Sequence, residues 1–451
     1  MDGDTGPPAT NASQRRLPRP ELLLRCGWVL MLTPAAAVVA LGWSTTGLQR
    51  SDFANSRMDF WIYFHAVRSP NLYGYVFVNP LDGSPNPFKY PPFAAMMMTP
   101  LRWIAERPAE YLWTSLSAVA ATLALYLVVR ELVSNHGLSR AWVPWLVAAG
   151  LMTIPVVRTL QLGQINEFVA VLVAIDVVLV NRRSRWAGIG IGLAVALKLT
   201  PAVFIPVLLF NKSLRRSGWT ASLTALGATA LAFVARPGDS VRYWSAEVFA
   251  TGRVDDLYMK MSGAFRRFTM WLPGPEVIGT ALWLAVTVAL VGLVLVASRR
   301  LVAEDRVPDL MVVTGVLACV IFPITWPHHM FFAIAAVLVV ACRFRSRLGW
   351  AMATVGVIIL LDPFERGDGP YFTALQGLYM LCFVLAVCAQ AISGPRHSGP
   401  ASSAETVGFE PTVSFPTHDF QSCRFGRSRT SPDVPDAGET VRRSAAHQRF
   451  R

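Results

Sequence analysis

Residues 277–297 read VIGTALWLAVTVALVGLVLVA, a run of 21 residues without a charged side chain. A helix of about 20 apolar residues is long enough to span the ~30 Å hydrocarbon core of a bilayer. Five more stretches are about as long and largely apolar: Leu22–Trp43, Ala109–Val129, Ala141–Val157, Gln164–Val180 and Tyr371–Ala391. One soluble core could not bury so many stretches of this kind, so the sequence predicts an all-α polytopic membrane protein.

The composition of the whole chain supports the same class. Hydrophobic residues make up 53% of the 451 residues and charged residues only 15%, whereas soluble domains usually carry about 25% charged residues. A net charge of +13 on a soluble protein would suggest nucleic acid, but here the basic residues form short clusters between apolar stretches. The six cysteines show no CxxC spacing, so we interpret them as small hydrophobic residues. We expect no nucleic-acid partner.

The basic clusters predict how the chain is threaded, because Lys and Arg are enriched in cytoplasmic loops. The clusters are Arg15–Arg25, Arg130–Arg140, Arg182–Arg185, Lys212–Arg216, Arg299-Arg300 and Arg343–Arg347. With all of them inside, the chain crosses the membrane about twelve times, and the first span is an uncleaved signal anchor. Four polar segments then share the outer side, namely 44–90, 159–166, 236–274 and 323–329. An active site that faces outward would be assembled from these segments.

Prolines are expected to interrupt two apolar stretches, because proline cannot donate to the helix ladder. Residues 91–105 contain three prolines and predict a half helix that returns to the outer face. Residues 186–210 begin and end beside inside clusters, so they must hold two short helices, or a helix and a re-entrant arm, broken near Lys198-Leu199-Thr200-Pro201. The glycines of this stretch, Gly188, Gly190 and Gly192, are expected to permit close helix packing rather than to bind a nucleotide.

The chain is predicted to have three parts. Residues 1–20 form a cytoplasmic tail, and residues 21–392 form the membrane domain. Residues 393–451 are rich in Ser, Pro, Arg and Gly with little periodicity, so we expect a disordered tail. Its run Gly408-Phe409-Glu410-Pro411 back-translates to a sequence like the conserved arm of a tRNA gene. We hypothesise that the reading frame runs into such a gene on the opposite strand.

Candidate site residues begin in the first outer segment. Asp59 lies in an amphipathic, aromatic stretch suited to the membrane interface, where a carboxylate could act as general base for a hydroxyl. The alternative is a solvated loop acid or a helix cap. Lys89 or Tyr90 could meet a phosphate, or this aromatic-proline turn could only anchor the chain at the interface.

Further candidates lie at the entrances of later spans. Gln161, Gln164 and Asn166 could bind sugar hydroxyls, or they could form hydrogen bonds between helices. Lys198 lies in a strongly apolar stretch, where a lysine is costly unless it faces a cavity or an anion. We therefore expect it to bind a phosphate or carboxylate. Asp176 is expected to make a structural bond between helices.

Two basic pairs fall on outer segments. Arg266 and Arg267 oppose the orientation rule, and an anionic headgroup or phosphate would explain them. His328 and His329 open a span, where helix N-termini favour anions. The alternatives are an ordinary basic loop for the arginines and interface histidines for the second pair.

Taken in order, these segments resemble glycosyltransferase family 87, polyprenyl-phosphate-mannose-dependent α-(1→2)-mannosyltransferases and their relatives with the GT-C architecture. The resemblance covers residues 20–392. It rests on Asp59, Lys89-Tyr90-Pro91-Pro92, residues 161–166, Ala196–Pro201 and Thr325–His329. The second outer loop of the family usually carries Asn-Gln-Ser before an arginine. This chain has Lys260-Met261-Ser262 before Arg266, so only the serine and an arginine match.

The resemblance implies a GT-C bundle of about twelve transmembrane helices that transfers a hexose, with mannose expected, from a polyprenyl-phosphate donor. Asp59 would be the base and the anomeric carbon would be inverted. Lys198, Arg266, Arg267, His328 and His329 would bind the donor phosphate, where charge develops. Lys89, Tyr90, Gln161, Gln164 and Asn166 would bind substrate. The acceptor would be a cell-envelope glycolipid or polysaccharide. The site would face the extracytoplasmic side of the cell membrane, without a metal or cofactor.

Other functions remain open at this point. An arabinofuranosyltransferase or a protein mannosyltransferase would share the GT-C fold. A secondary transporter or flippase would also have about twelve spans and intramembrane charges such as Asp176 and Lys198. Transporters usually show two similar halves with a site at mid-membrane, and no internal repeat is evident here.

Overall fold

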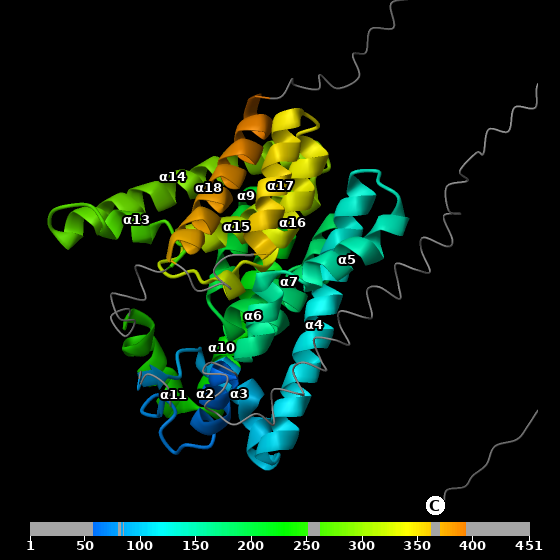
Figure 1. Ribbon diagram of the computed structural model, residues 1–451. Helices are drawn as coiled ribbons and strands as arrows, with labels where there is room; N and C mark the ends of the chain where they lie inside the picture. Colours follow the sequence, from blue (N-terminus) through cyan, green and yellow to red (C-terminus); the bar gives the residue numbers. More distant parts are fainter. Residues whose placement is uncertain (1–56, 80–82, 84, 251–261, 362–369, 394–451) are drawn as a thin grey trace, which may run out of the picture. The chain divides into compact units, whose positions relative to one another are not determined.

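The computed structural model describes residues 57–79, 83, 85–250, 262–361 and 370–393, and almost all regular structure among them is helical (Figure 1). The helices of the first half are α2 (Met58–Ala66), α3 (Pro92–Met98), α4 (Glu106–Asn135), α5 (Val143–Leu151), α6 (Ile154–Leu162), α7 (Asn166–Asn181), α8 (Ile189–Leu197), α9 (Phe204–Phe210), α10 (Arg215–Ala235) and α11 (Pro237–Ser245). Those of the second half are α13 (Arg266–Met270), α14 (Glu276–Ala303), α15 (Val307–Ile321), α16 (Phe331–Arg343), α17 (Arg347–Leu361) and α18 (Pro370–Ser393).

Short elements connect the helices. The 3-10 turns are η1 (Thr99–Trp103), η2 (Arg140–Trp142), η3 (Thr200–Val203), η4 (Glu247–Phe249) and η6 (Pro327–His329). Two strands, β1 (Val76–Val78) and β2 (Pro85–Pro87), pair antiparallel, with Phe77 opposite Asn86. This hairpin belongs to the first segment that the sequence predicts to lie outside.

Several helices are long and apolar enough to cross a membrane. Within the described ranges there are four, in α4, α10, α14 and residues 373–393 of α18, and a fifth if the bent pair α5–α6 forms one span. The helical membrane class is therefore supported, while the number of about twelve crossings stays a prediction. The predicted first span, Leu22–Trp43, lies outside the described residues. The same holds for the predicted tails at both ends.

The predicted span 141–157 is divided between two helices. Residues 140–151 and α6 meet at an angle of 52°, and α6 begins at Ile154 with Pro155 in its first turn. Proline suits the first turn of a helix, but it cannot donate a hydrogen bond to the turn before it. Gln161 lies in the last turn of α6, and Gln164 follows directly after its C-cap, Gly163.

The glycines of α8 pack closely against α7 and α10, as predicted. A Cβ atom at Gly190 would lie 2.2 Å from the carbonyl oxygen of Leu172, and one at Gly192 would lie 2.6 Å from that of Ala221. Asp176 of α7 caps the start of α8, because its carboxylate oxygens accept from the backbone N–H groups of Gly188 at 2.9 Å and Ile191 at 2.6 Å. Asp176 thus has the structural role expected of it.

Both predicted interruptions occur. The half helix is α3 followed by η1, and α8 ends at Leu197. Lys198 then adopts an extended backbone, with φ −154° and ψ 128°, before η3 begins around Pro201. The break leaves the Lys198 side chain at the end of a helix instead of on its flank.

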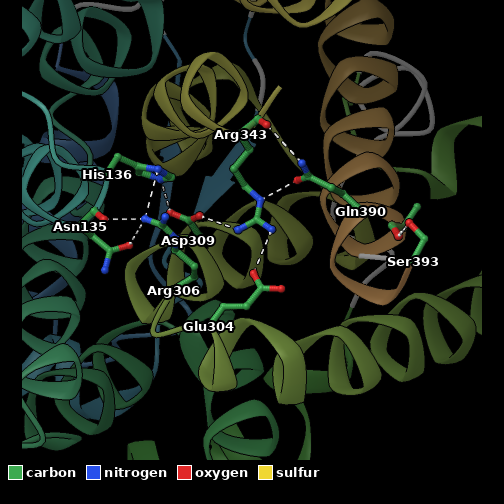
Figure 2. Close-up of polar contacts among 9 residues, drawn as sticks. Asn135, His136, Glu304, Arg306, Asp309, Arg343, Gln390 and Ser393 are labelled. Carbon is green, nitrogen blue, oxygen red and sulfur yellow. Dashed lines mark hydrogen bonds and ion pairs between the residues drawn. The ribbon is translucent and has the colours of Figure 1, made fainter. Parts of the chain in front are cut away.

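Buried ion pairs tie several helix ends together (Figure 2). We call Asp309, His136, Glu304, Arg343 and Gln390 the Asp309 network. The fully buried carboxylate of Asp309 contacts Nε2 of His136 at 2.9 Å and the guanidinium of Arg343 at 3.1 Å. Arg343 also donates to Oε1 of Gln390 at 2.7 Å and lies 3.4 Å from Glu304. The network joins ends of α4, α14, α15, α16 and α18, for all of which the sequence predicts the same side of the membrane.

Candidate active site

Asp59 lies in α2, and Arg57, the residue just before this helix, fixes it to the bundle. The guanidinium of Arg57 is 3.5 Å from Glu110 of α4 and donates to the carbonyl oxygens of Leu160 and Gln161. Gly163 allows α2 to approach α6 closely: its φ is +69°, and a Cβ there would lie 2.7 Å from that of Phe60. Only glycine adopts this backbone conformation easily while leaving such room. Asp59 itself is 9% exposed.

An ordered amide faces the Asp59 carboxylate. The Oε1 atom of Gln164 accepts hydrogen bonds from the hydroxyls of Tyr90 at 2.8 Å and Tyr63 at 3.3 Å. The two hydroxyls are themselves 2.9 Å apart. With its oxygen occupied in this way, Gln164 presents its NH₂ group to Asp59 and forms a side-chain hydrogen bond with it.

The electrostatic surroundings of Asp59 suit a general base. Burial raises the pKa of Asp59 to about 6, and the Gln164 hydrogen bond and the charges of Lys198, Lys89 and Arg158 keep it from rising further. A base works best when its pKa lies near the working pH. Asp59 is therefore largely ionised at neutral pH and still basic enough to take a proton from a hydroxyl.

Lys198 reaches toward the same place from the other side. Its ammonium donates to Oδ1 of Asn166 at 2.6 Å, and it lies 5.7 Å from the centre of the Tyr90 ring. Asn166 in turn donates to the carbonyl oxygen of His328 at 2.7 Å. The break after α8, the start of α7 and the turn η6 thus meet around one cation.

The two histidines of η6 are neutral, and His328 is buried while His329 is half-buried. Burial lowers the pKa of His328 and His329 well below the usual range, and the positive charge of Lys198 lowers both further. Nδ1 of His329 is placed to accept from the backbone N–H of Trp326 at 3.2 Å, which assigns the proton to Nε2. His329 is therefore a neutral hydrogen-bond donor rather than a second cation.

A pocket of about 70 Å³ opens beside Lys198. Its polar lining includes Lys198, Asn166 and His329 together with two threonines, and most of the remaining wall is apolar, including Val169, Phe204 and Phe332. Such a pocket suits a ligand that has an anionic head and an apolar tail. It lies between α7, η3, α15 and the segment that leads into α16.

The other predicted site residues divide into two groups. Lys89 is exposed but close enough for its charge to act on Asp59, and Gln161 accepts from Arg158 at 3.0 Å. Arg266 instead pairs with Glu276 at 3.5 Å, against α14. Arg267 is 1% exposed and donates to the carbonyl oxygen of Ser262 at 3.4 Å. Neither arginine is among the residues that line the pocket.

The sequence interpretation missed two residues of this site. Tyr63 lies four residues after Asp59, which places both on the same face of α2, so helical spacing could have found it. Arg158 precedes an outer segment by one residue, and its charge acts on both Asp59 and His328. A basic residue on the outer side was the available signal, as it was for Arg266 and Arg267.

A buried carboxylate, a nearby lysine and an apolar pocket, in a bundle with helices long and apolar enough to span a membrane, are the features of a membrane-enzyme site. The model of glycosyltransferase family 87 matches residues 88–323. The chain belongs to glycosyltransferase family 87, as the resemblance predicted, and the prediction of a membrane glycosyltransferase is confirmed.

Relatives of known function agree with the family. A polyprenol-phosphate-mannose-dependent alpha-(1-2)-phosphatidylinositol mannoside mannosyltransferase of Mycobacterium tuberculosis is 31% identical over 348 residues, which are 70% of this chain and 79% of that protein. The enzyme of the same description from Mycolicibacterium smegmatis is 31% identical over 358 residues, 71% and 79% of the two chains. An alpha-(1->3)-arabinofuranosyltransferase of Mycobacterium tuberculosis is 32% identical over only 127 residues, 27% and 29% of the two chains.

Proposed function

We propose that this enzyme transfers mannose from a polyprenyl-phosphate donor to a phosphatidylinositol mannoside, with inversion at the anomeric carbon. The observation that supports this proposal most directly is that Asp59 lies close enough to Lys198 to feel its charge, while Lys198 itself lines a largely apolar pocket. The descriptions of the two mannosyltransferase relatives support the choice of donor and acceptor. The arabinofuranosyltransferase alternative is weaker, because that likeness covers about a quarter of the chain.

The proposed reaction is a single displacement. Asp59 accepts the proton of an acceptor hydroxyl while the oxygen of that hydroxyl forms a bond to the anomeric carbon. The bond between that carbon and the phosphate oxygen breaks, and the electron pair leaves with the polyprenyl phosphate. Attack from the side opposite the phosphate inverts the configuration, so a β-linked donor gives an α-linked product.

Lys198 and His329 stabilise the leaving group in this scheme. The leaving phosphate gains negative charge as the bond breaks, and fixed donors that face it lower the barrier most. Lys198 supplies a charge, and neutral His329 supplies its Nε2–H group. The polyprenyl chain lies along the apolar wall near Phe204 and Phe332.

The amides and aromatic residues hold the sugar and acceptor in place. Gln164 and Asn166 are oriented by their bonds to Tyr90 and Lys198, so sugar hydroxyls meet donors and acceptors of fixed direction. Gln161 and exposed Lys89 lie on the approach to Asp59. We assign them to the acceptor side.

The test is the Asp59→Asn variant in membranes supplied with labelled polyprenyl-phosphate mannose and a phosphatidylinositol mannoside acceptor. We expect transfer to fall by about 10²- to 10⁴-fold, the usual contribution of a general base. Burial disfavours the ionised carboxylate of Asp59. The neutral asparagine side chain of the variant should therefore leave the thermal unfolding midpoint at about pH 7 unchanged or raise it. Transfer at the wild-type rate would exclude Asp59 as the base. If the wild type consumes no polyprenyl-phosphate mannose, the donor assignment itself is wrong.

We also propose that the site faces the outside of the cell membrane. Val78 in β1 is 59% exposed, and Ser139 lies in an exposed loop that the threading places inside. In intact cells a membrane-impermeant maleimide should label Val78→Cys but not Ser139→Cys, each introduced into a background without accessible cysteines. The reverse pattern would place the site on the cytoplasmic face.

A further inference from the structure

Arg57 and Arg267 are almost completely buried and Arg343 is largely buried, and among these three only Arg267 lacks an acidic partner within the described residues. Arg57 pairs with Glu110 at 3.5 Å, and Arg343 pairs with Asp309 at 3.1 Å. Arg267 is 1% exposed, yet no ion pair joins it to an acid in the part of the chain that the structure describes. Its Nε has no hydrogen-bond partner. A buried charge without a counter-charge costs several kcal/mol, so the fold keeps Arg267 at a cost to its own stability.

The surroundings of Arg267 suit a ligand from the membrane surface. Its guanidinium lies 4.8 Å from the Trp271 ring and donates to the carbonyl oxygen of Ser262 at 3.4 Å. Trp271 is 53% exposed, so displacing its indole opens a path to the guanidinium. Tryptophan is enriched at the level of lipid headgroups. The planar guanidinium can bind a phosphate through two parallel hydrogen bonds.

Arg267 lies apart from the cation of the donor pocket. Thr325 lines that pocket with Lys198, and its carbonyl oxygen accepts from the backbone N–H of Gly263 at 2.7 Å and from the hydroxyl of Ser262 at 3.2 Å. These bonds join Ser262 to the pocket wall, but neither Ser262 nor Arg267 itself lines the pocket. Burial lowers the pKa of Arg267. Arg267 therefore offers a cation outside the lining of the donor pocket.

We propose that Arg267 forms a second anion site, which binds the phosphodiester headgroup of the acceptor lipid while Lys198 binds the phosphate of the donor. The existence of the anion site follows from Arg267 itself, whereas its assignment to the acceptor rests on the proposed function. In a phosphatidylinositol mannoside the phosphodiester is separated from the reacting sugar by the glycan. A phosphate site away from Asp59 is what such an acceptor requires.

The test uses the full-length protein purified in a neutral detergent. Binding of phosphatidylinositol, phosphatidylcholine, farnesyl phosphate and inorganic phosphate is measured by the shift of the thermal unfolding midpoint. We expect Arg267→Met to weaken phosphatidylinositol binding by about 10-fold or more and to leave farnesyl phosphate binding unchanged. Lys198→Met should show the reverse. Arg242→Gln is the matched control, because Arg242 is an outer arginine that is already paired with Glu247 at 2.9 Å.

The sign of the stability change separates a binding site from a structural arginine. Without lipid, Arg267→Met should be as stable as the wild type or more so, because it removes an unpaired buried charge. If this variant fails to fold, Arg267 is structural and the proposal is wrong. Arg267→Lys keeps the charge but lacks the planar guanidinium. If Arg267 is structural, this variant should also lose stability. If Arg267 binds the lipid, the variant should be stable and bind phosphatidylinositol more weakly.

Other outcomes would also overturn the assignment. Equal protection by phosphatidylcholine would show that net charge is not recognised, and equal protection by inorganic phosphate would indicate a free-phosphate site. Loss of farnesyl phosphate binding in Arg267→Met would place Arg267 in the donor site. If farnesyl phosphate binding does not depend on Lys198, the proposed donor site fails, while the phosphatidylinositol result still decides the second anion site.

Discussion

The Asp309 network and the Asp59 site both bury charged groups, but they satisfy them in different ways. In the Asp309 network the carboxylate meets His136 and Arg343 directly, at 2.9 and 3.1 Å. In the site, Lys198 bonds to the neutral amide of Asn166 at 2.6 Å, and Asp59 bonds to the neutral amide of Gln164. A charge that is paired with a charge holds helices together. A charge that is held by a neutral amide is oriented and remains available to a substrate.

This difference leads to opposite consequences for stability. Removing one partner of a buried ion pair leaves the other charge uncompensated, which destabilises proteins strongly. Removing a buried charge that has only neutral partners takes away a desolvation cost. Substitutions in the two regions should therefore separate stability from activity.

The largest effect on stability is expected for Asp309→Ala. It leaves Arg343 and His136 facing each other without the carboxylate, and we expect the free energy of unfolding to fall by about 3–5 kcal/mol. The measurement is unfolding in detergent, with transferase activity expressed per folded molecule, which should stay near the wild-type value. The double variant Asp309→Ala with Arg343→Met should be less destabilised than the sum of the single changes. Full additivity would show that the two residues do not act as a pair.

The largest effect on activity in this comparison is expected for Lys198→Met. Loss of a cation from the leaving phosphate is expected to reduce kcat/KM by about 10²- to 10³-fold, comparable to the loss of an oxyanion donor. The unfolding midpoint without substrate should not fall, because Lys198 is hydrogen-bonded to a neutral amide and the variant removes the cost of burying its charge. A large loss of stability with little loss of activity would place Lys198 with the Asp309 network instead.

The pH dependence of transfer should follow Asp59. Because the pKa of Asp59 is raised to about 6 and the base must be ionised, kcat/KM should rise about tenfold per pH unit below pH 6 and level off above it. Lys89→Gln removes a positive charge that lowers this pKa, so the rising limb should move to higher pH. A value of kcat/KM that stays flat across an assay range of about pH 5 to about pH 8 would contradict the assignment of Asp59 as the base.

The smallest effect is expected for Tyr90→Phe. The variant removes one of two hydroxyls that orient Gln164, while Tyr63 still donates to the same oxygen at 3.3 Å. A loss of about 1 kcal/mol, or roughly fivefold in kcat/KM, is the usual value of one hydrogen bond. The double variant with Tyr63→Phe should lose clearly more than either single change. Equal losses would show that Gln164 needs no support from Tyr63.

Local sequence patterns predicted the features that depend on neighbouring residues. Pro201 and the glycines of α8 predicted the break at Lys198 and the close packing of α8, and an apolar surrounding marked Asp176 as a structural residue. The Asp309 network could not be predicted in this way. His136 and Asp309 are 173 residues apart in the chain, and no local pattern links them. The separate position of Arg267 likewise depends on contacts that no spacing reveals.

The site residues predicted from the sequence fall into two groups for a physical reason. Asp59, Gln164, Asn166 and Lys198 lie together because each follows or begins a helix whose direction the apolar pattern sets. Arg266 and Arg267 were treated as one pair, yet adjacent residues on a helix point in different directions. Arg266 turns to Glu276, and Arg267 turns inward under Trp271.

Asp176 fixes the start of α8, so the length of this helix sets how far Lys198 lies from that fixed point. From Ile189 to Leu197 it has nine residues, and at about 1.5 Å per residue it carries the chain about 13 Å from the fixed end to Lys198. One inserted residue would move the ammonium by about 1.5 Å and turn it by about 100°, away from Asn166. The length of α8 therefore fixes the position at which Lys198 would meet the proposed donor phosphate, and α8 should tolerate changes of composition far better than changes of length.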